Sequence, residues 1–271
     1  MSTLTTTIAD KVKPDKIMQY KQIGNVLLKA HVFYPKKHKP GDKKPVIAFF
    51  FGGGWVCGTP SQFYQQARFL NKQGMVAISF DYRVESKHKT TPFECVKDSK
   101  SAIRWIRKNA NKLGIDPDRV VASGGSAGGH VAACTGLIKG HEEHGEDMIV
   151  SSIPNLMVLF NPAVDTTRKG CGSEKLRGRE TELSPCHHVQ KGIVSTIVFH
   201  GTADAMVPFE NVERFTRLMT GAGNICVLKP FTDAKHGFFN GSWFRKKNSD
   251  EAFNRSMKKT VEFLKKYKIL N

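Results

Sequence analysis

The sequence predicts an α/β fold in which helices cover both faces of a mostly parallel central sheet. Short apolar runs, rich in β-branched and aromatic residues, recur along the chain, and stretches with helical periodicity separate most of them. Strands that are apolar along their whole length are typical of parallel sheets buried on both faces. The 271 residues contain no internal repeat and no long linker, so we expect a single domain over residues 1–271.

A hairpin is predicted first, with six strands and two long helices after it. The hairpin covers residues 17–35 and turns at residues 23–26. The strands are expected at residues 46–51, 75–80, 120–123, 157–160, 196–199 and 226–231. Apolar residues three or four positions apart predict one helix from Val96 to Leu113 and another from Phe253 to Leu264. Residues 1–16 are expected to form a tail that is too short for a lid.

The chain is strongly basic, with 42 lysines and arginines, 24 aspartates and glutamates, and a net charge of +18. Such a field attracts anions generally, including nucleic acids, acidic polysaccharides and membrane surfaces. The basic residues lie in short groups at 36–44, 104–112, 245–247 and 258–268. This scatter favours a solvated surface, with an acidic polysaccharide as the alternative partner. No nucleic-acid-binding module is recognisable, and no apolar run approaches the roughly 20 residues of a membrane span.

The N-terminus and the cysteines bear on the compartment. The first ten residues lack the charged start and apolar stretch of a signal peptide, which predicts a cytoplasmic protein, or a secreted or periplasmic one whose signal has been removed. The six cysteines form no CxxC pair. Cys171 and Cys186 bracket an irregular segment and are candidates for one disulfide, which would require an oxidising compartment.

The segment from Val120 to His130 contains the clearest catalytic motif. An apolar strand leads into Gly-Gly-Ser-Ala-Gly at residues 124–128, and a helical pattern follows. This is the G-x-S-x-G nucleophile elbow in its required context, because glycines leave room for a very tight turn between strand and helix. The turn would expose the hydroxyl of Ser126, and amides at the start of the helix would stabilise a developing negative charge. The alternative is a glycine-rich helix cap.

A serine nucleophile needs a base and a carboxylate, which follow this motif in the order acid, then histidine. Asp204 comes after the strand at 196–199, and His236 after the strand at 226–231. Carboxyl ends of parallel strands meet at one edge of a sheet, so both residues are expected to approach Ser126. We assign Ser126 as nucleophile, His236 as general base and then acid, and Asp204 as the carboxylate that fixes the imidazole tautomer.

Other titratable residues compete for these roles. Asp233 is nearer to the histidine in sequence than Asp204, but a carboxylate three positions away in a loop usually belongs to a turn or the surface. Asp165 follows a predicted strand and is a second alternative acid. We expect His200 to pack at its strand end and His130 to support the elbow helix.

Three glycines at residues 52–54 follow a buried strand. Unhindered backbone amides there could point at the same oxyanion as the elbow, so we assign the oxyanion hole to the amides of Gly53, Gly54 and Ala127. The alternative is a glycine-rich strand end without function.

No cofactor or metal is expected, because acyl transfer to water needs neither. The sequence His-Glu-Glu-His at 141–144 is one residue short of the HExxH zinc motif, and we expect a solvated helix end there. Cys-His-His at 186–188 is a weak metal candidate. The glycines at 124–129 are better explained by the elbow than by a nucleotide site.

Together, these motifs resemble those of α/β-hydrolases of the hormone-sensitive-lipase-like esterase group, and especially its compact bacterial acetyl and feruloyl esterases. The matching segments follow the family's order from about residue 45 to residue 240: Phe-Gly-Gly-Gly-Trp at 51–55, Asp-Tyr-Arg at 81–83, Gly-Ile-Asp-Pro at 114–117, Gly-Gly-Ser-Ala-Gly-Gly-His at 124–130, Asn-Pro at 161–162, Leu-Ser-Pro at 183–185, His-Gly-Thr-Ala-Asp at 200–204 and His-Gly-Phe at 236–238. The resemblance implies a serine carboxylesterase with the triad and oxyanion hole assigned above.

The chain departs from the family's pattern in two places. Phe51 stands where the family usually has a histidine that steadies the oxyanion loop, so the rigidity of that loop is in question. No helical N-terminal cap is predicted, and the polar segment at 165–188 is expected to be the only cover. An open site of this kind favours bulky or polymeric esters over buried long-chain lipids.

The expected substrate is a small ester or an acylated carbohydrate, hydrolysed at a short acyl group through an acyl-enzyme. Acetyl or feruloyl groups on a plant polysaccharide such as xylan would suit a basic enzyme with an open site. Trp55, Phe238 and Trp243 lie near the oxyanion loop and the histidine in sequence and are candidates for stacking on sugar or aryl rings, with ordinary packing as the alternative. The alternative functions are an amidase, such as an arylformamidase, and a non-catalytic binding protein on the same fold.

Overall fold

The computed structural model describes residues 12–271, which form one eight-stranded sheet with the order β1-β2-β4-β3-β5-β6-β7-β8. The N-terminal hairpin pairs β1 (Lys16–Ile23) with β2 (Val26–Phe33), and β2 lies antiparallel to β4 (Val76–Phe80). All other neighbouring strands are parallel. The mostly parallel α/β sheet is therefore confirmed, whereas residues 1–11 of the predicted tail lie outside the described residues.

The predicted strands are all present, and β5 extends beyond its predicted segment at both ends. The remaining strands are β3 (Lys44–Phe50), β5 (Ile115–Gly125), β6 (Leu156–Phe160), β7 (Thr196–Gly201) and β8 (Cys226–Phe231). Strands β4, β6 and β7 are buried along their whole length, which explains their apolar sequences without alternation. Strand β1 lies at one edge of the sheet and has mostly exposed or half-buried side chains.

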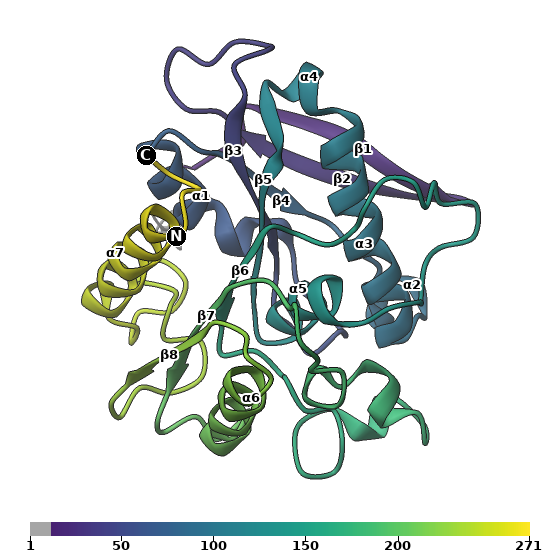
Figure 1. Ribbon diagram of the computed structural model, residues 1–271, viewed down its shortest axis with the longest axis vertical. Helices are drawn as coiled ribbons and strands as arrows, with labels where there is room; N and C mark the ends of the chain where they lie inside the picture. Colours follow the sequence, from purple (N-terminus) through teal and green to yellow (C-terminus); the bar gives the residue numbers. More distant parts are fainter. Residues whose placement is uncertain (1–11) are drawn as a thin grey trace, which may run out of the picture.

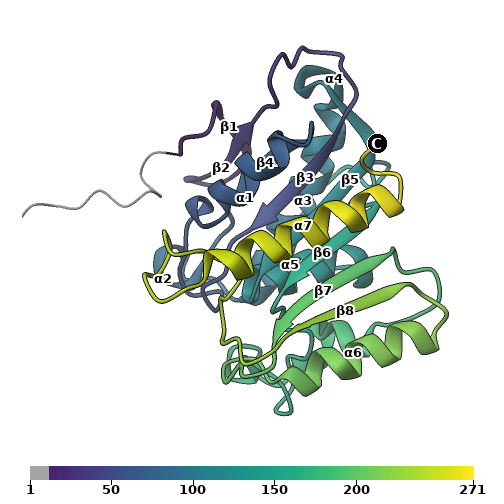
Figure 2. The same cartoon turned by 90° about the vertical axis from the view of Figure 1, so that its left-hand side faces the viewer.

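Helices form a layer on each face of the sheet (Figure 1 and Figure 2). One apolar core lies under α3 (Pro92–Lys108), α5 (Ala127–Leu137) and α6 (Phe209–Gly221). The other lies under α1 (Tyr64–Asn71) and α7 (Asp250–Lys266). Alternate residues of the strands enter the two cores, as the period of a β-strand requires. No helix within residues 12–271 is long and apolar enough to cross a membrane.

Several connections contain short helices that border the carboxyl ends of the strands. Strand β3 is followed by η2 (Pro60–Phe63), and β4 is followed by α2 (Glu85–His88). The segment at 165–188 contains three short 3-10 helices, η3 (Ser173–Lys175), η4 (Glu180–Leu183) and η5 (Pro185–His187).

The helix predicted from Val96 to Leu113 is broken in the structure. It begins earlier, at Pro92, where Thr91 and Glu94 form a capping box. It ends at Lys108, and α4 (Ala110–Leu113) follows after Asn109. The side-chain amide of Asn109 donates to the carbonyl of Trp105 at 2.9 Å, a local bond that competes with helix continuation.

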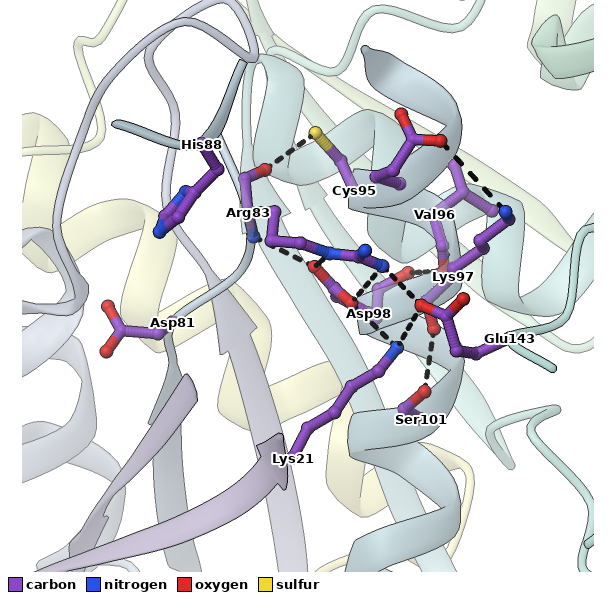
Figure 3. Close-up of polar contacts among 12 residues, drawn as sticks. Lys21, Asp81, Arg83, His88, Cys95, Val96, Lys97, Asp98, Ser101 and Glu143 are labelled. Atoms are coloured by element: carbon purple, nitrogen blue, oxygen red, sulfur yellow. Dashed lines mark hydrogen bonds and ion pairs between the residues drawn. The ribbon is translucent and has the colours of Figure 1, made fainter. Parts of the chain in front are cut away.

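A buried ion-pair cluster joins the hairpin to the helical layer (Figure 3). The fully buried carboxylate of Asp98 on α3 accepts hydrogen bonds from the amide, Nε and Nη2 of Arg83 at 2.9, 2.8 and 2.8 Å. It also accepts one from the Nζ of Lys21 on β1 at 2.7 Å. Glu143, in the loop after α5, pairs with both cations. Two carboxylates thus neutralise two cations where β1, α3 and two loops meet.

Replacing Asp98 with asparagine is expected to lower the free energy of unfolding by about 3–5 kcal/mol, because two buried cations would lose their shared carboxylate. The control is Asp15→Asn, since the pair of Asp15 with Arg68 has side chains 38% and 33% exposed. That variant should lose about 0–1 kcal/mol. Urea denaturation of both variants measures the difference. Equal losses would contradict the importance of the buried cluster.

Candidate active site

The nucleophile elbow lies between β5 and α5. Ser126 has φ 57° and ψ −123°, a strained conformation for a residue with a side chain. A Cβ on Gly124 would lie 2.3 Å from the carbonyl oxygen of Gly128, and a Cβ on Gly128 would lie 2.1 Å from that of Phe50. Neither glycine can be replaced without moving the backbone. The amide of Ser126 donates to the carbonyl of Phe160 on β6 at 3.0 Å, which anchors the turn to the sheet.

The structure brings the three predicted triad residues together. The Nε2 of His236 lies 2.9 Å from the Oγ of Ser126, and its Nδ1 lies 2.7 Å from Oδ2 of Asp204. A carboxylate can only accept, so Nδ1 carries the hydrogen and the lone pair of Nε2 faces the serine hydroxyl. This is the tautomer that a general base for Ser126 requires. The three side chains arise from the turns after β5, β7 and β8, as the sequence predicts.

The carboxylate of Asp204 is buried and held by several donors. Burial alone would raise its pKa, but hydrogen bonds from His200, His236 and the amide of Val207 lower the pKa well below its usual range. Oδ1 accepts from the amides of Met206 and Val207 at 2.9 and 3.0 Å. Asp204 is therefore ionised at neutral pH, which suits its orienting role.

The alternative acids serve other purposes. Asp165 pairs with Arg214 and accepts from the amide and hydroxyl of Thr167 at 2.9 and 2.7 Å. Asp233 is exposed, and its amide donates to the hydroxyl of Thr202. Neither carboxylate has a hydrogen bond to His236 within the described residues.

The three amides assigned to the oxyanion hole have no acceptor within residues 12–271. Gly53 and Gly54 have φ values of 141° and 63°, and Ala127 is the first residue of α5. A Cβ on Gly53 would lie 2.0 Å from the carbonyl oxygen of Cys57, so the loop needs glycine there. Unpaired amides at a helix start and on an adjacent strand end can receive the negative oxygen of a tetrahedral intermediate.

Phe51 does not leave the oxyanion loop loose. Its ring is 1% exposed and stacks on Tyr82 with ring centroids 4.2 Å apart. The hydroxyl of Tyr82 donates to the carbonyl of Phe51 at 2.6 Å. Further along, Gln62 accepts from the amide of Gly52 at 2.5 Å, and the amide of Glu85 donates to the carbonyl of Trp55 at 3.0 Å. Packing and these hydrogen bonds steady the loop without the usual histidine.

Trp55, His130 and Leu183 form a hydrogen-bonded chain behind the oxyanion loop. The indole Nε1 of Trp55 can only donate, and it lies 3.1 Å from the Nδ1 of His130, so Nδ1 accepts. The Nε2 of His130 therefore carries the hydrogen and donates to the carbonyl of Leu183 at 2.7 Å. Burial lowers the pKa of His130 to about 4, which keeps the ring neutral. The predicted support of the elbow helix by His130 thus extends to the oxyanion loop and the 165–188 segment.

The predicted stacking role of Trp55, Phe238 and Trp243 is not supported by their burial. Trp55 is 3% exposed and covered by Gly172, where a Cβ would lie 2.5 Å from the indole ring. Phe238 is 6% exposed and packs against Phe231 in the second core. Trp243 packs edge-on against Phe253 on α7 with ring centroids 4.5 Å apart. Trp55 and Phe238 are thus buried by packing, and Trp243 is half-buried against α7.

Two positioning contacts escape prediction from the sequence. The side-chain oxygen of Asn161 accepts from the amide of Gly237 at 3.1 Å and so fixes the loop that carries the catalytic histidine. His200 is buried at its strand end, as predicted, but its Nε2 also lies 3.3 Å from Oδ2 of Asp204. The position of Asn161 directly after β6, at the catalytic edge of the sheet, is the signal that could have pointed to it.

The cysteines and the His-Glu-Glu-His segment also differ from expectation. All six cysteines are free, so the candidate disulfide between Cys171 and Cys186 is not formed in the structure. The thiol of Cys186 is buried, which raises its pKa to about 11, and it faces Arg214. The segment at 141–144, expected to be a solvated helix end, lies in the loop after α5, and its Glu142 pairs with the buried Lys100 and Arg104 on α3. No cluster of metal-ligating residues occurs in the described part of the chain.

The chain is similar to two protein families and to a solved esterase. The model of the BD-FAE family matches residues 31–167, half of the chain, and that of the dienelactone hydrolase family matches residues 177–268. Thermogutta terrifontis esterase 2, solved after phosphoramylation by tabun, is 44% identical, with a TM-score of 0.89 over 94% of this chain and 95% of that one. Its propionate-bound structure is 43% identical, with a TM-score of 0.88 over 94% and 95% of the two chains.

Curated relatives are more distant. Esterase LipC of Mycobacterium tuberculosis is 28% identical over 224 residues, which are 75% of this chain and 55% of LipC. An acetylxylan esterase of Xylanibacter ruminicola is 26% identical over 208 residues, which are 72% of this chain and 41% of that enzyme. The chain thus spans about half the length of the curated relatives it matches.

The hydroxyl of Tyr82 gives a direct test of loop positioning. Tyr82→Phe keeps the stacked ring but removes the donor to the Phe51 carbonyl, so kcat on p-nitrophenyl acetate should fall roughly tenfold, equivalent to one lost hydrogen bond, with less change in KM. Tyr267→Phe is the control, since the hydroxyl of Tyr267 has no partner within residues 12–271. An unchanged kcat with a lower melting temperature would show that the hydroxyl only stabilises the fold.

The depressed pKa of His130 predicts a pH dependence of stability. Between pH 6.5 and about 4 the unfolded chain binds a proton at His130 that the folded chain does not. Stability should therefore fall as the pH falls through this window, by about 3 kcal/mol for this residue. His130→Gln should flatten the pH dependence of urea unfolding, whereas His144→Gln, at an exposed position, should not. The same slope in the wild type and His130→Gln would contradict this origin.

Proposed function

The chain belongs to the BD-FAE family and has the α/β-hydrolase fold, and we propose from this premise that it is a serine carboxylesterase that hydrolyses short-chain acyl esters. One observation carries the proposal. Hydrogen bonds join a serine hydroxyl to an imidazole and the imidazole to an ionised carboxylate, and unpaired backbone amides lie beside them. This is the constellation that acyl transfer requires.

The geometry supports a two-step reaction. The Oγ of Ser126 attacks the ester carbonyl carbon while Nε2 of His236 takes the hydroxyl proton. The oxyanion accepts hydrogen bonds from the amides of Gly53, Gly54 and Ala127. The tetrahedral intermediate then collapses when His236 gives its proton to the departing alcohol. A water molecule, deprotonated by the same imidazole, then attacks the acyl-enzyme. The carboxylic acid leaves, and the proton returns to Ser126.

The acyl group and the alcohol are proposed from relatives and from the openness of the site. Propionate-bound and butyrate-bound structures exist for the similar esterase 2, which supports short acyl chains. The similarity to an acetylxylan esterase supports an acylated carbohydrate as one substrate class. The side chain of His236 remains 22% exposed, so a polymeric alcohol could reach the nucleophile. Acetyl groups on a polysaccharide such as xylan are therefore a natural substrate to test, with feruloyl groups beside them.

Hydrolysis of p-nitrophenyl acetate, butyrate and octanoate, with acetylated xylan in parallel, tests the proposal. Ser126→Ala should lower kcat by several orders of magnitude, and Asp204→Asn by roughly 10³–10⁴-fold. Asp233→Asn is the matched control, because Asp233 is exposed and nearer to the histidine in sequence. It should keep full activity. Acetate should be preferred over octanoate.

Three outcomes would contradict this proposal. Faster hydrolysis of matched amides, such as aryl formamides, would favour an amidase. Equal rates for the wild type and Ser126→Ala on every ester and amide would favour a non-catalytic binding protein. Loss of activity in Asp233→Asn, but not in Asp204→Asn, would overturn the assignment of the acid.

A further inference from the structure

A basic groove lies on the surface between the start of β1, the loop after β2 and the helices α1 and α4. Two adjoining hollows of about 590 and 570 Å³ form it, and both are bordered by Tyr34, Lys36 and Arg68. We use the name basic groove for the surface lined by Lys16, Tyr34, Lys36, Arg68, Lys72 and Lys112.

The basic groove and the triad lie at opposite ends of the strands. Lys36 follows the end of β2, Lys72 precedes β4, and Lys112 precedes β5, so these residues surround the amino ends of the parallel strands. The catalytic turns follow the carboxyl ends of β5, β7 and β8 (Figure 1). Strand β3 spans the sheet between these two ends with 7 residues, and at about 3.3 Å per residue the ends are roughly 20 Å apart. A ligand in the groove would leave the triad open.

The charges in the groove are unbalanced. Lys16, Lys36, Lys72 and Lys112 are exposed and form no ion pair within residues 12–271. The one carboxylate in the lining, Asp15, is occupied by Arg68, whose two terminal nitrogens each lie 2.7–2.8 Å from it. With Lys37, which also lines the groove, is exposed and forms no ion pair within residues 12–271, five lysines therefore face solvent without a counterion from the groove itself. Cations gathered along a hollow attract an anionic chain more strongly than the same charges spread over a convex surface.

The chemistry of the groove suits an anionic chain that also carries rings. Its unpaired cations are all lysines, which act as point charges and attract carboxylates as well as phosphates. The single arginine of the groove, Arg68, is already engaged by Asp15. The ring of Tyr34 stacks on His38 at 4.6 Å, which holds an aromatic surface at the side of the groove. Sugar rings could lie against such a surface while their carboxylates contact the lysines.

We propose that the basic groove binds an acidic polysaccharide, a chain bearing uronate carboxylates, at a site separate from the triad. The benefit of such binding rests on the proposed function. A polysaccharide held at the groove would raise the effective concentration of its own acyl groups, or of those on attached chains, around the open triad. Binding itself needs no intact triad, so the two proposals can fail independently.

The experiment compares the binding of polygalacturonate to the wild type and to two charge-matched variants. The groove variant carries Lys16→Gln, Lys36→Gln, Lys72→Gln and Lys112→Gln. The control variant removes the same charge at exposed lysines elsewhere that also form no ion pair, through Lys139→Gln, Lys191→Gln, Lys258→Gln and Lys265→Gln. We expect the groove variant to bind at least about tenfold more weakly at low salt, with a shallower salt dependence, and the control variant to lose less than about threefold.

Hydrolysis of p-nitrophenyl acetate should be the same in all three proteins, because the substitutions lie far from the triad or on other surfaces. Equal losses of binding in both variants would overturn the groove and leave only general attraction by a basic protein. Tighter, groove-dependent binding of poly(dT) than of polygalacturonate at the same salt concentration would overturn the assignment to a polysaccharide. Absence of hydrolysis by the wild type would count against the proposed function and not against the groove.

Discussion

The catalytic site depends on the close approach of helix α5 to strand β3. At Gly128 the helix backbone passes so near the strand that a Cβ would lie 2.1 Å from the carbonyl oxygen of Phe50 and 2.3 Å from that of Phe51. This approach brings the start of α5, which carries the nucleophile and the amide of Ala127, against the strand end that carries the other two oxyanion amides. The strained conformation of Ser126 is tolerated because β5 fixes the residue before it, α5 fixes the residue after it, and its own amide donates to the carbonyl of Phe160.

The oxyanion loop shows how packing can replace a single hydrogen-bonding side chain. With phenylalanine at position 51, the loop gains a ring that stacks on Tyr82, and the Tyr82 hydroxyl reaches back to the Phe51 carbonyl. Tyr82 is itself placed by its neighbour Arg83, whose amide and side chain are held by the buried Asp98. A chain of contacts thus runs from the ion-pair cluster to the oxyanion amides, and the rigidity of the loop depends on the turn after β4.

The sequence predicts the sheet and the triad well because both rest on local rules. Apolar runs specify buried strands, and the elbow needs glycines at fixed spacing, so Ser126, Asp204 and His236 follow from motif and chain order. Contacts between distant segments have no such rule. Trp243 is near the catalytic histidine in sequence but packs against α7, and Glu142 is bound by cations of α3 that no motif connects to it. Tertiary packing decides in which direction a side chain points and which residues from distant segments pair with each other.

The ion pairs also show where the net charge of +18 is available for binding. On the α3 side, Asp98, Glu142 and Glu143 neutralise buried cations, so the basic residues there stabilise the fold and attract little from solution. At the amino ends of the strands, lysines line a hollow whose single carboxylate is already paired. Solubility requires only that charge be spread over the surface. Lysines gathered in a hollow create a local electric field that attracts anions. Because this hollow lies at the opposite ends of the strands from the triad, a polymer would be attracted at one site and hydrolysed at another.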